Sequence, residues 1–279
     1  MPAPTTIRVA HSPDSDDAFM FWALSTGRVD TEGLRYEHIL KDIETLNREA
    51  ASGTYEVTAL SFHAYAHLAD RYDLLPHGAS FGDGYGPVLV VKKGFREADL
   101  DRVEVAIPGE RTTAALALRL WRAGLRTRVM PFDAIQPAVH AGEAAAGLLI
   151  HEGQLTWQDE GLVKVVDLGE WWKAETGLPL PLGGNGIRRD LGPALQAKVS
   201  RHLRASIAHG LEHRGDGLAH AERYSRGLPR EKTDRFVGMY VNDWTLDYGD
   251  AGRRAVALLL ERGHAAGAIP RRVEPRFVS

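Results

Sequence analysis

The stretch "GPVLVVKK", residues 86–93, is an apolar strand between a Gly-Pro turn and two lysines, and it divides the chain into two similar sets of elements. On each side of it, short β-branched runs alternate with stretches of helical spacing, which is typical of an α/β layered fold. One set ends near residue 90, and the second runs from about residue 94 to about residue 185. Each set therefore predicts one sheet with its own helices.

Beyond residue 190 the pattern changes, because four helical stretches follow with few strand signals. The chain would then cross between the two sets twice, near "VLVVK" and near "GGNGIRR", which begins at Gly183. We predict a two-lobed α/β fold with a central cleft, in which the helical tail packs on the first lobe. The predicted larger lobe is residues 1–90 plus 190–279, and the predicted smaller lobe is residues 91–189.

The composition is that of an ordinary globular protein and excludes several classes of function. The 279 residues are 44% hydrophobic and 25% charged, with a formal net charge of −3. This balance excludes nucleic-acid binding by bulk positive charge. The absence of cysteine from the sequence excludes disulfides, thiolate catalysis and cysteine-ligated zinc or iron–sulfur clusters.

Export and membrane signals are also absent from the sequence. Its first residues contain no basic region followed by an apolar run of signal-peptide length, and no run of about 18 apolar residues occurs elsewhere. We therefore expect a cytoplasmic protein that acts on a small molecule, without a membrane or nucleic-acid partner.

The segment "HSPDSDDAFMFW", residues 11–22, follows the first strand and opens a helix. Ser12, Asp14 and Asp16 are residue types that favour helix N-termini. Two interpretations are open: a capping cluster on an exposed turn, or a polar loop that faces a ligand crevice at the strand ends. The second interpretation makes Ser12 and Asp16 candidate ligand-binding residues.

Two further strand ends repeat this pattern. In "TALSFHAYA" a strand ends at Leu60 and Ser61 caps the helix that follows, and in "IPGERTTAAL" Thr112 and Thr113 stand at a helix start. Each of these alone is an ordinary cap. Together, the positive ends of helices from both lobes would suit a small carboxylate or another polar ligand.

His151 is the strongest candidate for chemistry. It lies in "AGLLIHEGQLTW", residues 146–157, directly after an aliphatic run at 148–150 that predicts a short buried strand. The ordinary histidine pKa of about 6.5 allows proton exchange at neutral pH. His151 is either a structural loop residue or a catalytic base at the carboxyl end of a strand, and its expected place on the cleft side favours the base. No H-x-x-x-H or H-E-x-x-H metal pattern surrounds it.

Other features give weaker signals. His63 and His67 have the spacing of a metal-binding pair but no suitably spaced carboxylate. Trp171 and Trp172 either cover an aromatic ligand or pack between the lobes, and we expect packing. The glycines of "GGNG", residues 183–186, allow close backbone approach. The sequence contains no dinucleotide loop, Walker A motif or G-x-S-x-G nucleophile elbow.

Taken in order along nearly the whole chain, these motifs resemble the 1,4-dihydroxy-6-naphthoate synthases of the futalosine route to menaquinone. The segments "GLLIHE" and "WWKAETGLPLPLG" are the most specific parts of the resemblance. The other matching segments are "HSPDSDDAFMFWAL", "DIETLNREA", "LSFHAYA", "GYGPVLVVKK", "IPGERTTAALAL" and "YVNDWTLDYGDAGRRAVALL".

The resemblance implies a type 2 periplasmic-binding-protein fold without a secretion signal, and a lyase that uses no organic cofactor or metal. It implies cleavage of cyclic dehypoxanthine futalosine to 1,4-dihydroxy-6-naphthoate, with release of the sugar-derived remainder. The family's base falls on His151. Its ligand-binding positions fall on Ala59, Leu60, Ser61, Thr112 and Thr113.

We expect a neutral His151 to take a proton from the bound substrate, with aromatisation of the naphthalene ring as driving force. Three other classes of protein stay open. A transporter's solute-binding protein predicts an export signal, and a regulatory ligand-binding domain predicts a DNA-binding module, for which the length leaves no room. The third is the chorismate dehydratase of the same pathway, which incubation with chorismate would identify.

Overall fold

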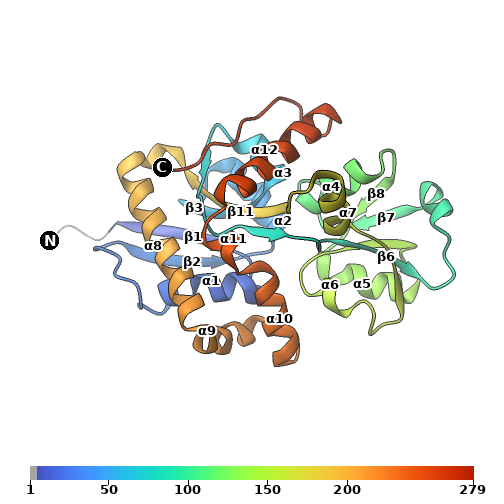
Figure 1. Ribbon diagram of the computed structural model, residues 1–279, viewed down its shortest axis with the longest axis horizontal. Coiled ribbons are helices and arrows are strands. Elements are labelled where there is room, and N and C mark those ends of the chain that lie inside the picture. The colour runs from blue at the N-terminus through green and yellow to red at the C-terminus, as the bar shows by residue number, and fades with distance from the viewer. Residues whose placement is uncertain (1–4) are drawn as a thin grey trace.

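The computed structural model describes residues 5–279 and contains two β-sheets that lie side by side, each covered by helices (Figure 1). The predicted two-lobed alternation of strands and helices is therefore confirmed. The residue boundaries predicted for the lobes stay a prediction, because sheet pairing assigns strands to a lobe and does not define where the connecting segments divide.

The first sheet has the strand order β2-β1-β3-β11-β4, with β5 paired to β11. Strand β1 is parallel to both β2 and β3, so the carboxyl ends of these three strands reach the same edge. Strand β11 returns antiparallel to β3, β4 and β5. The strands are β1 (Thr6–His11), β2 (Arg35–Leu40), β3 (Val57–Ser61), β4 (Tyr72–Leu74), β5 (Ser80–Gly82) and β11 (Leu180–Arg188).

The second sheet has the order β10-β6-β9-β7-β8. Strand β7 is parallel to β8 and β9, whereas β6 is antiparallel to β9 and β10. The carboxyl ends of β7 and β9 therefore leave the sheet at one edge. The strands are β6 (Val88–Lys92), β7 (Glu104–Ile107), β8 (Arg126–Val129), β9 (Ala146–Leu149) and β10 (Leu162–Asp167).

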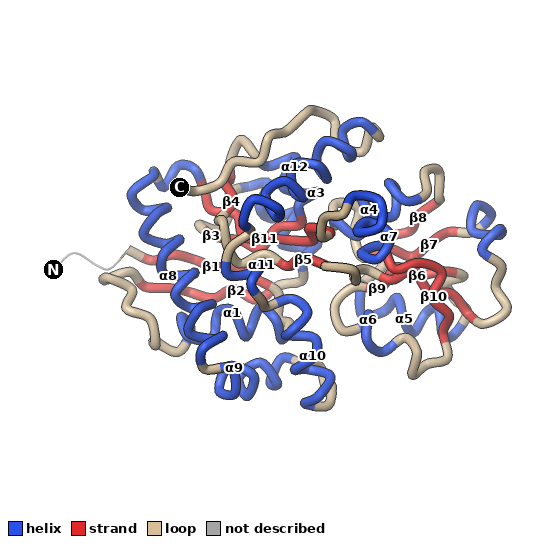
Figure 2. Tube along the Cα trace, in the orientation of Figure 1, coloured by secondary structure: helices blue, strands red, loops and turns tan. Residues whose placement is uncertain are grey.

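The helices divide between the lobes, and the C-terminal ones build up the first lobe (Figure 2). With the first sheet are α1 (Ser15–Ser25), α2 (Ile43–Glu49), α3 (Phe62–Leu68), α8 (Pro193–Glu212), α9 (Arg214–Ala221), α10 (Arg230–Tyr240), α11 (Asp243–Leu246) and α12 (Gly249–Ala265). With the second sheet are α4 (Thr113–Trp121), α5 (Phe132–Ala141), α6 (Gly153–Thr156) and α7 (Leu168–Thr176). Helices α8, α9 and α10 pack on α1, and α12 packs on α3 and β11, which confirms that the tail packs on the first lobe.

A close backbone contact marks the first crossing between the sheets. Gly86, just before β6, lies against Gly169 at the start of α7. A Cβ atom on Gly169 would lie 1.8 Å from the carbonyl oxygen of Tyr85, a distance that no side chain permits. Glycine is therefore required here for the crossing segment to pass α7.

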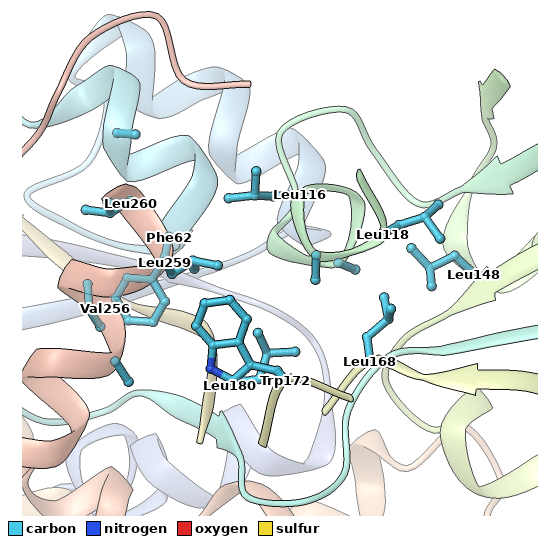
Figure 3. Close-up of a cluster of buried hydrophobic side chains, with 14 of the residues drawn as sticks. Phe62, Leu116, Leu118, Leu148, Leu168, Trp172, Leu180, Val256, Leu259 and Leu260 are labelled. Atoms are coloured by element: carbon cyan, nitrogen blue, oxygen red, sulfur yellow. The ribbon is translucent and has the colours of Figure 1, made fainter. Parts of the chain in front are cut away.

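The largest hydrophobic cluster joins the two lobes around Trp172, which is fully buried. Figure 3 shows it together with Phe62 of the first lobe and Leu148 of the second. The indole N–H of Trp172 donates to the carbonyl of Pro179 at 3.1 Å, so its polar atom is satisfied in the core. Trp171 is half-buried beside it, with 6.1 Å between the ring centroids. Both tryptophans thus pack in the core between the lobes, as expected.

Two details of the predicted elements differ from the structure. The strand expected over 148–150 ends at Leu149, so Ile150 and His151 belong to the loop that follows it. Strands β4 and β5 were not predicted, because each has only three residues and cannot display an alternating pattern.

Trp172 offers a test of the shared core. Replacing Trp172 by Ala should lower the free energy of unfolding by about 3–5 kcal/mol, because it opens a large cavity in the core. Trp171→Ala is the matched control and should cost less than about 2 kcal/mol, since that ring is already partly exposed. Urea unfolding of both variants measures the difference; equal losses would contradict the central position of Trp172.

Candidate active site

A pocket of about 760 Å³, counting its opening to solvent, lies between the two sheets and is lined from both lobes. It contains every residue that the sequence predicted for catalysis or binding. These are Ser12, Asp16, Ala59, Leu60, Ser61, Thr112, Thr113 and His151. Strand topology brings these residues together, because the carboxyl ends of β1, β3, β7 and β9 all point to this cleft.

The starts of α3 and α4 meet at the pocket from opposite lobes. The hydroxyl of Thr112 accepts a hydrogen bond from the backbone N–H of Ala115 at 3.2 Å, so Thr112 caps α4 as predicted. The backbone N–H of His63 in α3 donates to the hydroxyl of Thr113 at 3.4 Å. Two helix starts therefore approach the same space, where their positive ends favour an anionic group.

Ser61 occupies the N-cap position of α3, but the prediction that it caps the helix is wrong. Its hydroxyl makes no capping hydrogen bond and instead accepts one from the side-chain amide of Asn47 at 3.0 Å. The side-chain carbonyl of Asn47 accepts the backbone N–H of Ser61, also at 3.0 Å. Asn47 is fully buried in α2 and fixes the Ser61 turn from behind, a role that an isolated helical asparagine does not reveal in the sequence.

Asp14 overturns the interpretation of the first loop as an exposed capping cluster. Only 1% of Asp14 is exposed, and its carboxylate makes no capping hydrogen bond to α1. Its Oδ2 atom lies 3.0 Å from Nδ1 of His151, and its Oδ1 atom accepts a hydrogen bond from Arg226. The loop therefore faces the cleft, and its most buried carboxylate joins the first lobe to the second.

His151 is held tightly in an uncommon conformation. Its φ angle is +52°, in the left-handed region that non-glycine residues seldom adopt. Asp14 holds Nδ1, the edge of the ring packs against Phe132 at 4.9 Å between centroids, and 19% of the side chain is exposed. Because Nδ1 is engaged, Nε2 is the nitrogen available to a molecule in the pocket.

The charge of His151 differs from the expected neutral form. Burial alone would lower the pKa of His151, but the carboxylates of Asp14, Glu152 and Asp16 together raise it to about 9. Without a ligand, His151 is therefore an imidazolium ion at neutral pH. The sequence-based expectation was wrong because it used the ordinary histidine value and ignored the carboxylates that folding brings to this ring.

The carboxylates of the site divide into two kinds. Burial raises the pKa of Asp14, but His151 and Arg226 outweigh it and hold that pKa below its ordinary value, so Asp14 is ionised. Burial and the neighbouring Asp14 raise the pKa of Asp16 to about 7, and burial also raises that of Asp17. The site thus contains a firmly ionised carboxylate and, next to it, one that carries a proton near neutral pH.

The C-terminal tail contributes pocket residues that the sequence did not indicate. Phe236 and Tyr240 of α10 line the pocket. The Tyr240 hydroxyl shares a hydrogen bond of 2.6 Å with the side-chain amide of Gln154 in α6, which links the tail to the second lobe. These residues lie on a helix far along the chain, and nothing in its amphipathic pattern distinguishes them from core residues.

Of the weaker candidates, Gly183, Gly184 and Asn185 of "GGNG" line the pocket, whereas His63 and His67 do not. His63 and His67 border a separate hollow next to Arg111 and Arg119. Within residues 5–279, no three histidine, aspartate or glutamate side chains come together as a metal site. No helix in the same part of the chain is long and apolar enough to cross a membrane.

Comparison with known proteins agrees with this geometry. A 1,4-dihydroxy-6-naphthoate synthase of Thermus thermophilus is 42% identical over 98% of this chain and 99% of its own length. The solved structure of protein AF1704 from Archaeoglobus fulgidus has a TM-score of 0.91 and 50% identity, covering 95% of this chain and 98% of its own. The alkanesulfonate-binding protein SsuA of Xanthomonas axonopodis has a TM-score of 0.71 at 13% identity over 99% and 98%, which shows the periplasmic-binding-protein fold alone.

The sequence also matches the model of a protein family described as "Menaquinone biosynthesis" over residues 7–265. This match covers nearly the whole chain, including both sheets and every residue of the pocket. The protein therefore belongs to the menaquinone biosynthesis family.

Proposed function

We propose that this protein is a cytoplasmic 1,4-dihydroxy-6-naphthoate synthase. It cleaves cyclic dehypoxanthine futalosine into 1,4-dihydroxy-6-naphthoate and a sugar-derived fragment, with His151 as base. The observation that carries the proposal is the His151–Asp14 pair at the wall of the interlobe pocket, in a chain 42% identical over its length to a relative of that name.

The pocket lining offers apolar surface and helix starts that favour an anion, which suit the aromatic rings and the carboxylate of this substrate. Ile43, Ile150 and Phe236 supply apolar surface for the fused rings. The helix starts at Ser61 and at Thr112 suit the carboxylate of the substrate. The carboxylates of Asp14, Asp16 and Asp17 line the same pocket and repel an anion, so the helix starts are the better place for the substrate's carboxylate.

His151 carries out the proton abstraction in this proposal. Its Nε2 takes a proton from a ring carbon, and the electrons of that C–H bond complete the aromatic ring while the bond to the sugar-derived fragment breaks. Asp14 keeps Nδ1 protonated and stabilises the imidazolium that forms. Asp16 lines the same pocket and supplies a proton to the departed fragment in a later step, which does not limit kcat/KM; its pKa of about 7 keeps it partly protonated near neutral pH.

Turnover is the first test. Purified protein incubated with cyclic dehypoxanthine futalosine should release 1,4-dihydroxy-6-naphthoate, detected by mass spectrometry. Chorismate should give no dehydration product. Binding of the futalosine compound without product would identify a binding protein instead, and dehydration of chorismate would identify the sibling enzyme.

Replacing the base should remove turnover but not binding. We expect His151→Gln to lower kcat by about 10²–10⁴-fold, the usual contribution of a positioned base, with KM changed by less than about threefold. His140→Gln is the control, because His140 is exposed on α5 outside the pocket. A His151→Gln enzyme with wild-type kcat would contradict the assignment of the base.

The pH dependence follows from the raised pKa of His151. Because that pKa is about 9, about one imidazole in a hundred is neutral at pH 7, and the neutral fraction grows tenfold with each pH unit. The kcat/KM of the free enzyme should therefore rise with pH until about 9 and then level off. A plateau already reached at pH 7.5 would show that His151 has the ordinary pKa.

Asp14→Asn should lower the raised pKa of His151. Removing the carboxylate leaves burial as the main influence on the ring, so the pKa of His151 should fall from about 9 to about 6.5 or lower. The ring titration, followed by NMR with isotope-labelled histidine, measures this directly. The pH profile of kcat/KM should move down with it while the maximal rate falls, because the asparagine no longer holds the correct tautomer. An unmoved titration would rule out Asp14 as the partner.

A further inference from the structure

Arg226 reaches the site from the C-terminal tail, between the short helical turn Glu222–Tyr224 and α10. Like His151, it has a φ angle of +52°, which a non-glycine residue adopts only where the surroundings hold it. Arg226 does not line the pocket. It therefore stands behind the reacting groups and has no direct contact with a ligand there.

The guanidinium group of Arg226 joins three residues from both lobes. It donates to Oδ1 of Asp14 in the first lobe, and its Nη1 donates to Oε2 of Glu152 in the second lobe at 2.7 Å. It also lies over the ring of Phe132, 4.7 Å from the centroid. That same ring packs against His151, so Arg226, Phe132, His151 and Asp14 form a closed circle of contacts.

The contact between Arg226 and Asp14 compensates a buried negative charge that the proposed reaction would otherwise leave unpaired. The carboxylate of Asp14 is almost completely buried, and a buried carboxylate needs a cationic partner to stay ionised. His151 is such a partner only while it is protonated, and it must lose that proton to act as a base. Arginine keeps its charge at every accessible pH.

We propose that Arg226 is a positioning residue for the reaction, acting as the permanent counter-ion that keeps Asp14 ionised and bonded to Nδ1 of His151 while His151 is neutral. Without it, Asp14 would compete for the proton and the ring would lose its orienting acceptor. The catalytic consequence rests on the proposed function. The effect on the charge of the His151–Asp14 pair does not, because it follows from the contacts alone.

A purely mechanical role makes a different prediction. If Arg226 only clamped the lobes together, breaking its bond to Glu152 would have the same effect as removing Arg226. Two further contacts already join the tail to the second lobe, Tyr240 with Gln154 and Lys232 with Asp159. The lobes therefore do not depend on Arg226 alone.

Within the described chain, the groups around the ring come from three segments. The charged and titratable groups that face His151 are Asp14, Asp16 and Asp17 of the first loop and helix α1, Glu152 beside it, and Arg226 through Asp14. All but Arg226 are carboxylates, which raise the pKa of the ring. Removing the arginine and removing a carboxylate should therefore shift the titration of His151 in opposite directions.

Arg226→Gln and Glu152→Gln are the matched pair for this test. The first removes the counter-ion of Asp14; the second breaks the same cross-lobe ion pair but leaves the bond between Arg226 and Asp14. We expect Arg226→Gln to raise the pKa of His151 by about one unit or more, and Glu152→Gln to lower it. The measurement is an NMR titration of the isotope-labelled histidine rings, with His151 assigned from the His151→Gln spectrum.

Activity provides the second readout. At pH 7, kcat/KM of Arg226→Gln for cyclic dehypoxanthine futalosine should fall about tenfold or more, following the loss of neutral imidazole. Arg226→Lys keeps the charge but not the paired geometry. It should raise the pKa of His151 by less than Arg226→Gln does and recover part of kcat/KM. It also serves as the folded variant if Arg226→Gln does not fold.

Three results would overturn the proposal: an unmoved His151 titration in Arg226→Gln, shifts of the same sign in the matched pair, or a loss in Arg226→Lys as large as in Arg226→Gln. The titrations need no substrate. A wild-type protein that gives the predicted titrations but no dihydroxynaphthoate would therefore overturn the proposed function and leave the charge role of Arg226 standing.

Discussion

One buried carboxylate organises the site. Asp14 is 1% exposed, and its two oxygens are engaged by His151 of the second lobe and by Arg226 of the C-terminal tail. An ionised group in such a place is stable only with its charge compensated and its hydrogen bonds made. Three segments that are far apart in the sequence must therefore meet at this point. Their meeting joins the two lobes beside the pocket and sets the charge of the His151 ring.

The fold brings these segments together through strand order and a shared core. In each sheet, parallel strands direct the loops at their carboxyl ends toward the cleft, so Ser12, Ser61, Thr112 and His151 converge without any direct link between them. The hydrophobic cluster around Trp172 contains residues of both lobes and joins them as well. The lobes thus meet through apolar packing at one place and through charge at another. Apolar packing is non-directional, whereas the charged contacts depend on close geometry.

The sequence was sufficient to predict those features that produce a local pattern of residue types. Alternating strands and helices predicted the two lobes and the cleft, and polar residues at strand ends led to the candidates Ser12, Asp16, Ser61, Thr112, Thr113 and His151. The candidates Ala59 and Leu60 came only from the family resemblance. What it missed depends on pairing over long distances: Asp14 and Arg226 are 212 residues apart, and Arg226 and Glu152 are 74 apart. For Asp14 the sequence left both an exposed cap and a cleft-facing loop open, because an aspartate fits either. The predicted charge of His151 was wrong because Asp14 and Asp16 of the other lobe, together with Glu152 beside it, determine the pKa of the ring. Phe236 and Tyr240 gave no signal because they resemble core residues of their helix, and Asn47 gave none because it resembles an ordinary helical asparagine.

The role of His151 depends finally on where a bound molecule lies. A crystal structure of the protein with 1,4-dihydroxy-6-naphthoate in the cleft would measure this. We expect the naphthalene rings to occupy the interlobe pocket with Nε2 of His151 about 3 Å from a ring atom or its oxygen, while Asp14 still holds Nδ1. A product bound outside this pocket, or an imidazole turned away from it with its contact to Asp14 broken, would contradict the assignment of His151 as the base.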